Sequence, residues 1–303
     1  MIKKLLPLFL VMFSAVLYSK QNIVEKKTGG VDFVYIPSGS FVMGAAAAGK
    51  DYNPPHNVRI SKGFWLSKFE ITQKQYKDVT GTNPCEESKY GEGDNLPVYN
   101  ISWYEAVGFC NKLSKLNGLD AYYEISTDDE DDDNVSQYDE MKWKVTIIKD
   151  ANGFRLPTEA QWEYGCRGGA RTDFYWGNNS SWDVSGNYSW HMFNAGLKNY
   201  SKGRFWWVKY HKVKKTGTRI PNKYGLYDMD GNVAEWCFDR YSRSYYSESD
   251  KDDPVCSEGE FTYRVVRGGS MLDSPNDFKS YKRWPVEPFE RIGMNGLRVV
   301  LPE

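Results

Sequence analysis

The sequence lacks the catalytic signatures of several common enzyme classes. Only three of its 303 residues are histidines, and they form no HxH, HxxxH or HExxH pair. It also has no GxSxG elbow and no P-loop glycine-lysine motif. A serine hydrolase, a P-loop nucleotidase and a histidine-based metal enzyme are therefore disfavoured, because each needs particular side chains at fixed spacing.

The chain has no excess of charge of either sign. Its 39 basic and 40 acidic side chains leave a formal net charge of −1. We expect no nucleic-acid binding, because that depends on clustered Lys and Arg that release counterions. Aromatic residues make up 16% of the chain, with 11 Trp and 22 Tyr, so the sequence predicts an ordered protein with a large core.

Long apolar runs are absent except at the start. The run Leu5–Leu17 follows Lys3 and Lys4, which is typical of a secretory signal. It is shorter than the roughly 20 residues of a membrane span. We expect a signal peptide over 1–19 and an exported mature chain, 20–303, that is periplasmic, cell-surface or extracellular and has no membrane span. The alternative is a buried N-terminal helix or an uncleaved anchor.

Cysteines are few and form no CxxC pair, which disfavours a zinc ribbon or a thioredoxin-type site. Cys110, Cys166 and Cys237 lie in apolar or aromatic segments and are predicted to be buried packing residues. Cys85 and Cys256 lie in polar loops and are the better disulfide candidates. The odd number, five, leaves at least one free thiol.

The pattern of elements predicts one α+β domain with unusually long loops. A hairpin is expected over 31–42, around a Pro-Ser-Gly turn. Capping boxes that begin at Thr72, Ser102 and Thr158 predict three helices. After Gly169 only short strands are expected, such as those at 264–266 and 297–300. Six consecutive acidic residues, 128–133, predict a solvated, mobile insertion rather than a calcium loop.

Five ordered motifs resemble those of one family. They occupy 33–44, 96–106, 154–164, 224–236, and 267–270 together with 296–298. This pattern is similar to the formylglycine-generating-enzyme, or sulfatase-modifying-factor, family, whose fold is a variant of the C-type lectin fold. The resemblance covers about residues 30 to 301, which implies a single lectin-like domain.

The resemblance also implies a calcium site in the loop between Tyr224 and Trp236. The matching positions are the side chains of Asp228 and Glu235 and the carbonyl oxygens of Gly231 and Val233. Oxygen ligands on a tight loop suit a hard cation such as calcium. The alternative is that the two carboxylates cap turns or pair with arginine.

Active enzymes of the family hold copper(I) with two cysteines after the Gly-Gly-Ser motif. Counted from Ser270, those positions here hold Asp273 and Phe278, and no cysteine follows Cys256. Copper(I) requires soft thiolate ligands. We therefore expect neither bound copper nor catalysis of this type.

The C-terminal loop that remains, 271–295, mixes aromatic rings with charged groups, as recognition surfaces do. The alternative is that its rings pack the loop onto the body. The predicted ligand-binding residues are Asp273, Asp277, Phe278, Tyr281, Trp284, Glu287 and Phe289.

Together these features favour a secreted, non-catalytic protein that binds a protein or glycan through the C-terminal loop. A retroelement-diversified variable protein is a special case of this hypothesis. The alternatives are a sulfatase-modifying oxidase, which converts a peptide cysteine to formylglycine, and a structural component of the cell envelope.

Overall fold

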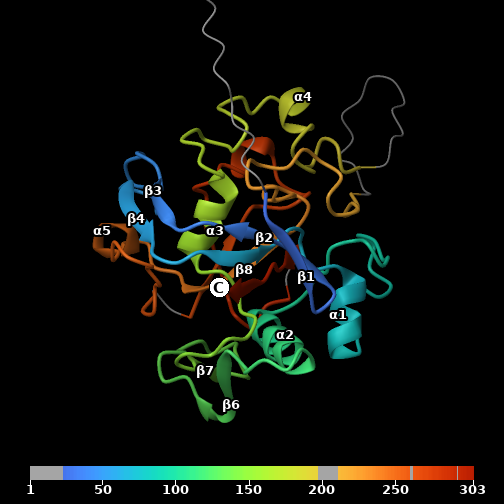
Figure 1. Ribbon diagram of the computed structural model, residues 1–303, viewed down its shortest axis with the longest axis vertical. Helices are drawn as coiled ribbons and strands as arrows, with labels where there is room; N and C mark the ends of the chain where they lie inside the picture. The colour runs from blue at the N-terminus through green and yellow to red at the C-terminus, as the bar shows by residue number, and fades with distance from the viewer. Residues whose placement is uncertain (1–22, 197–210, 260–261, 292) are drawn as a thin grey trace, which may run out of the picture.

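The computed structural model describes residues 23–196, 211–259, 262–291 and 293–303. The predicted signal peptide lies outside these residues. The described ranges form one α+β domain in which short elements are joined by long loops (Figure 1). Within those ranges, no helix has the length and apolar character needed to cross a bilayer.

The first sheet joins the two ends of the described chain. Its strand order is β1-β2-β5-β12, and all three pairings are antiparallel. Both faces of β2 are packed: Val31 and Phe33 are buried in one apolar cluster, and Val34 and Ile36 in the other. The strands are β1 Glu25–Thr28, β2 Val31–Ile36, β5 Phe64–Ser67 and β12 Val300–Pro302.

The second sheet has the order β10-β9-β8-β11 and is built from the C-terminal part of the chain. β8 and β9 are the two inner strands, and all of their residues except Phe238 are buried. The strands are β8 Ala234–Arg240, β9 Arg264–Arg267, β10 Trp284–Val286 and β11 Asn295–Gly296.

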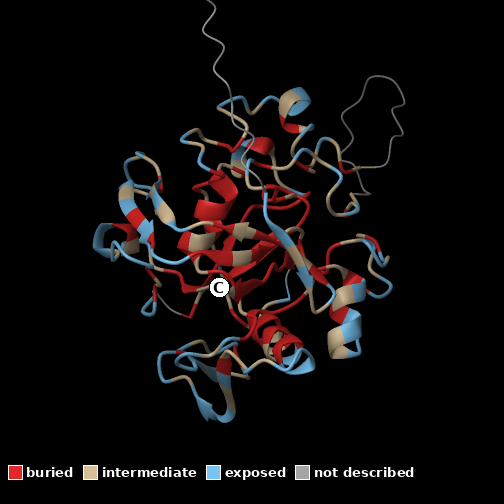
Figure 2. Cartoon of the chain, viewed as in Figure 1, coloured by how far each residue is buried: buried red, intermediate tan, exposed pale blue. Residues whose placement is uncertain are grey.

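Two hairpins stand apart from these sheets. In one, β3 Gly39–Met43 pairs with β4 His56–Ile60. In the other, β6 Tyr123–Glu130 pairs with β7 Trp143–Ile147, and this hairpin projects from one end of the molecule (Figure 1). The acidic run ends β6 and continues into its loop, where its side chains are largely exposed (Figure 2).

Three capped helices confirm the prediction from the capping boxes. They are α1 Gln73–Thr80, α2 Trp103–Leu116 and α3 Glu159–Arg167. In each, the hydroxyl of the N-cap residue accepts a hydrogen bond from the third helical residue, whose side chain bonds back to the N-cap amide. The other helices are short: α4 Trp182–Ser185, α5 Tyr245–Glu248 and the 3-10 turn η1 Pro275–Asp277.

Three sequence predictions need correction. The strands within 31–42 exist but do not form a hairpin, because β2 pairs with β1 and β5 while β3 pairs with β4. Only Val300 of the segment 297–300 lies in a strand. All five cysteines are free and buried, so Cys85 and Cys256 are not disulfide-bonded. Their thiols instead donate to the carbonyl oxygens of Tyr99 and Glu258.

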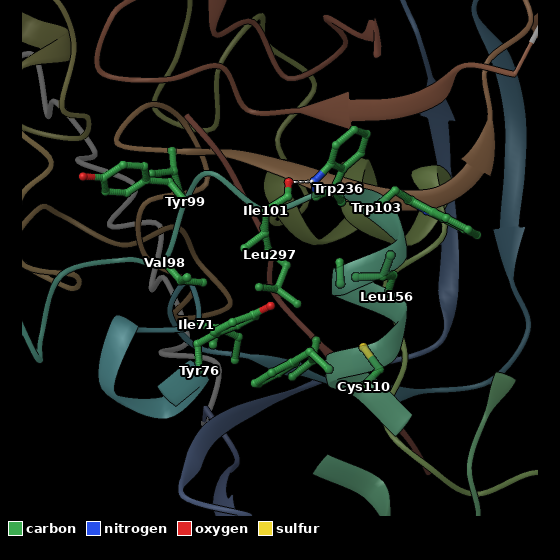
Figure 3. Close-up of a cluster of buried hydrophobic side chains, with 14 of the residues drawn as sticks. Ile71, Tyr76, Val98, Tyr99, Ile101, Trp103, Cys110, Leu156, Trp236 and Leu297 are labelled. Carbon is green, nitrogen blue, oxygen red and sulfur yellow. Dashed lines mark hydrogen bonds between the residues drawn. The ribbon is translucent and has the colours of Figure 1, made fainter. Parts of the chain in front are cut away.

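A mainly apolar core surrounds α2 (Figure 3). Trp103, Phe109 and Leu113 of α2 are buried in it, and the ring of Phe109 stacks on that of Tyr76. The indole Nε1 of Trp236 donates to the Ile101 carbonyl oxygen at 3.0 Å, the dashed contact in the figure. Burial of these aromatic and aliphatic side chains stabilises the domain.

A buried ion network lies beside α3. Glu159 binds Arg267 at 2.6 Å and Arg283 at 2.7 Å, and Glu163 binds Arg267 at 2.6 Å. All four side chains are at most 1% exposed. The network therefore fixes α3 to β9 and to the segment that leads into β10.

Candidate ligand-binding site

A small cavity opens where the second sheet meets the C-terminal loop. Its volume is about 170 Å³. It contains two of the predicted ligand-binding residues, Asp273 and Trp284. The complete lining is Ala234, Val266, Gly269, Ser270, Asp273, Trp284, Val286, Met294 and Asn295.

The polar groups of this cavity are partly fixed and partly unsatisfied. Asp273 accepts hydrogen bonds from the amide and the hydroxyl of Ser270 on one carboxylate oxygen, each at 2.8 Å. Asn295 is 7% exposed, and its buried Nδ2 has no partner among the described residues. A buried donor without a partner is costly. The residues that line the cavity therefore include one carboxylate acceptor fixed by Ser270 and one amide donor without a partner.

Phe278 and Tyr281 pack the loop onto the body instead of facing a ligand. Gly269 has φ +63, and a Cβ there would lie 2.8 Å from the Phe278 ring, which is 1% exposed. The Tyr281 ring packs on Tyr52, with centroids 4.8 Å apart. The prediction that these two rings contact a ligand at the surface is corrected, because both are buried.

Asp277 has a local role that the sequence did not suggest. Its Oδ2 accepts a hydrogen bond from the Ser274 hydroxyl at 2.7 Å, which closes the turn at η1. It does not line the cavity that contains Asp273 and Trp284.

The last two predicted residues, Glu287 and Phe289, line a wider groove of about 660 Å³. Val286 contributes to both the cavity and the groove. The sequence therefore predicted one surface where the structure has two, which adjoin at Val286 of β10.

The loop predicted to bind calcium places Asp228 in a buried position. Its Oδ2 accepts from the Gly217 amide at 2.6 Å, while its Oδ1 is buried and has no partner among the described residues. Burial is the largest effect on this carboxyl and raises its pKa to about 6. An unpaired buried carboxylate oxygen suits a cation ligand.

Glu235 is engaged differently. Its carboxylate binds Arg298 Nε at 2.6 Å and Nη2 at 2.7 Å, and it accepts the indole N–H of Trp162 at 2.6 Å. No set of three or more His, Cys, Asp or Glu side chains in the described ranges is arranged to hold a metal ion. A calcium site would therefore rely on Asp228 and on the carbonyl oxygens of Gly231 and Val233.

Comparison with known families identifies the chain. Residues 20–302 match the model of the sulfatase-modifying factor enzyme 1-like domain. The chain belongs to this family. The resemblance seen in the five ordered motifs is thus confirmed.

The chain is similar to proteins of different names. The chain is 34% identical over 250 residues to the chaperone protein LppX of Paenibacillus barcinonensis, covering 81% of this chain and 80% of that one. It is 32% identical over 269 residues to the inactive C-alpha-formylglycine-generating enzyme 2 of Bos taurus, covering 83% and 80%. Treponema denticola variable protein 1 superposes with a TM-score of 0.74 at 27% identity, covering 93% and 99%.

The residues of the cavity differ from a copper(I) site in their donor chemistry. Copper(I) prefers soft thiolate ligands. Asp273 lines the cavity with a carboxylate, and Phe278 lies beneath the glycine turn. None of the cavity-lining residues is a cysteine. The side chains present therefore do not suit the copper chemistry that the resemblance led us to consider.

Several contributing residues were missed from the sequence. Ser270 was named only as part of a glycine-serine turn, although its hydroxyl orients Asp273. Asn295 gave no signal, because its role follows from the parallel pairing of β11 with β8. Tyr138 and Glu290 of the groove lie 152 positions apart, and no local pattern connects them.

Proposed function

We propose that this member of the sulfatase-modifying factor family is an exported, non-catalytic protein that binds a protein or glycan through its C-terminal loop region. The observation that carries the proposal is the cavity in which Asp273 and the unsatisfied Asn295 amide lie beside Trp284. A fixed acceptor, a free donor and an aromatic ring are the groups that orient a polar ligand.

The size of the cavity restricts what it holds. Its volume of about 170 Å³ is below the roughly 300–1,000 Å³ of sites that enclose a whole small molecule. One side chain or one sugar ring of a larger ligand fits this description better. The rest of such a ligand would lie on the surrounding surface.

Two relatives support a role without catalysis. One is named an inactive formylglycine-generating enzyme, and a structural neighbour is named a variable protein. The special case of a retroelement-diversified variable protein predicts sequence differences between strains that concentrate after Arg267.

Binding is tested by truncating the cavity tryptophan. The Trp284→Ala variant should weaken saturable binding of the mature protein, measured on a glycan array and on immobilised envelope proteins, by at least tenfold. Trp182→Ala is the matched control, because this ring is 67% exposed on α4 and lies outside the cavity.

Two outcomes would overturn the proposal. If Trp284→Ala binds as tightly as the wild type while remaining folded, the cavity is not the binding site. If the purified protein carries stoichiometric copper and converts a peptide cysteine to an aldehyde, the protein is an enzyme and not a binding scaffold.

We also propose that calcium binds at Asp228 and adjacent carbonyl groups. Excess calcium should raise the thermal unfolding midpoint, since a ligand at about 100 times its Kd stabilises by roughly 2.7 kcal/mol. Asp228→Asn should abolish this shift, and chelation should reverse it in the wild type. A midpoint that does not respond to calcium or to chelator would exclude the site.

A further inference from the structure

The groove that Glu287 and Phe289 line is built from parts of the chain that are distant in sequence. One wall is Tyr138, in the loop of the β6–β7 hairpin, and the other is β10 with the turn after it. The hairpin projects at the end of the molecule opposite α4 (Figure 1). The lining residues are Tyr138, Tyr263, Pro285, Val286, Glu287, Phe289 and Glu290.

Tyr138 is held in an exposed position by the residue that follows it. Its side chain is 72% exposed. Asp139 is buried and accepts hydrogen bonds from the Tyr104 hydroxyl at 2.8 Å and from Asn134 Nδ2 at 2.7 Å. Its other oxygen accepts the amides of Met141 and Lys142 at 2.9 and 3.0 Å. These four hydrogen bonds anchor the loop, so the ring of Tyr138 faces solvent at a fixed edge of the groove.

The groove carries negative charge that no side chain of the described ranges neutralises. Neither Glu287 nor Glu290 has an ion pair there. Glu287 accepts a hydrogen bond from the Thr262 hydroxyl, which orients its carboxylate. Burial, followed by the neighbouring charge of Glu287, raises the pKa of Glu290 above its ordinary value. A cation placed between the two carboxylates would relieve this repulsion.

The basic residues beside the groove are committed to other partners. Arg291 forms a bidentate pair with Glu105, with both contacts at 2.8 Å. Arg264 stacks on the Trp103 ring, 3.8 Å from its centroid, and donates to the Phe238 carbonyl oxygen, while its buried Nε has no partner among the described residues. Arg240 binds Asp131 at 2.5 Å. None of these three guanidinium groups forms an ion pair with Glu287 or Glu290.

The backbone of β10 offers little to a partner strand. This strand is at the edge of its sheet, but its central residue is Pro285, which has no N–H to donate. Recognition in the groove must therefore come from side chains. Aromatic rings beside carboxylates bind ammonium and guanidinium groups, through cation–π attraction and through charge.

From these contacts we propose that the groove is a second binding site, which takes a lysine- or arginine-rich segment of a partner protein. Tyr138 and Phe289 would contact the aliphatic stems and charged heads of the basic side chains. Glu287 and Glu290 would pair with those charges. This proposal is independent of the cavity at Asp273, because the two share only Val286.

The test uses hexalysine amide as a probe with the full mature protein. Binding is measured by fluorescence anisotropy of the labelled peptide at low ionic strength. Glu290→Gln and Tyr138→Ala should each weaken binding about fivefold, in line with the loss of one charge pair or one cation–π contact. Both residues lie at the surface of the groove, so the variants should fold.

Asp132→Asn is the matched control. It removes one negative charge from the same hairpin, at a side chain that is 94% exposed and does not line the groove. We expect less than a twofold effect. An equal loss in Asp132→Asn and Glu290→Gln would show diffuse attraction to the acidic run and overturn the proposal. So would the absence of hexalysine binding, or equal binding of a hexaglutamine peptide.

Discussion

The regions around α2 and α3 both contain fully buried side chains but are stabilised by different interactions. Beside α2, stacked rings and aliphatic side chains such as Phe109 and Leu113 exclude water. Beside α3, the helix contributes Glu159 and Glu163, which meet arginines from β9 and from the approach to β10. One region is mainly an apolar core, and the other contains a charge network.

The difference bears on the candidate site. Arg267 directly precedes the Gly268–Gly269 turn, and Arg283 directly precedes Trp284. Both walls of the cavity therefore begin at a residue whose charge is paired to Glu159. Burial beside α2 makes the domain stable, while the ion network beside α3 places the cavity.

The largest expected effect comes from breaking the network. Glu159→Ala should lower the free energy of unfolding by about 3–5 kcal/mol, because it leaves Arg283 buried without a carboxylate partner. Urea unfolding followed by tryptophan fluorescence measures this loss. Glu159→Gln retains the size of the side chain and one acceptor, so it should lose less.

Leu113→Ala is the comparison from the apolar core, and it should lower the free energy of unfolding by about 2–5 kcal/mol.

The losses of stability in Glu159→Ala and Leu113→Ala should differ in their dependence on pH. Burial tends to raise the pKa of Glu159, but Arg283 and Arg267 outweigh it and hold the pKa below its ordinary value. Its contribution is present above the ordinary carboxyl pKa and is lost as pH falls through the lower, native one. The Glu159→Ala loss should thus shrink below about pH 4, whereas the Leu113→Ala loss should not. A Glu159→Ala loss under about 1 kcal/mol at pH 7 would contradict the role of the network.

The contrast also explains how much the sequence could predict. The start of helix α2 was predicted correctly, because Ser102 and Glu105 form a local capping box before an apolar periodic segment. The family motifs identified the fold across almost the whole chain. These signals depend on neighbours within a few residues or on similarity to known proteins.

The arrangement of the site depends on contacts over long separations. Glu159 pairs with Arg283 across 124 positions, and Tyr138 joins Glu290 in a groove through the placement of a hairpin. Phe278 was predicted to be a surface ring, but it is buried against Gly269, where the absence of a Cβ leaves room for the ring. No periodicity or spacing encodes such contacts, so the sequence could not predict how the side chains of the C-terminal loop are oriented.

The smallest expected effect concerns His191, a buried polar residue in neither region. Its Nδ1 lies 3.2 Å from the Phe193 amide, which donates to it, so only Nε2 can carry a proton. Burial first, and then the charge of Arg219, lowers its pKa to about 4. Between about pH 6.5 and pH 4 this histidine is protonated in the unfolded chain but neutral in the native state. The free energy of unfolding therefore decreases as the pH falls.

Protonation of His191 in the unfolded chain should lower the free energy of unfolding by roughly 1–3 kcal/mol over this pH range. Urea unfolding of the wild type and of His191→Asn at pH 7 and pH 5 isolates it, because other titrating groups contribute equally to both proteins. The variant should lose less stability than the wild type between these two values. Equal losses would show that His191 accepts a proton in the folded protein as readily as in the unfolded chain. In that case, of the two buried groups, only Glu159 would make a pH-dependent contribution to stability.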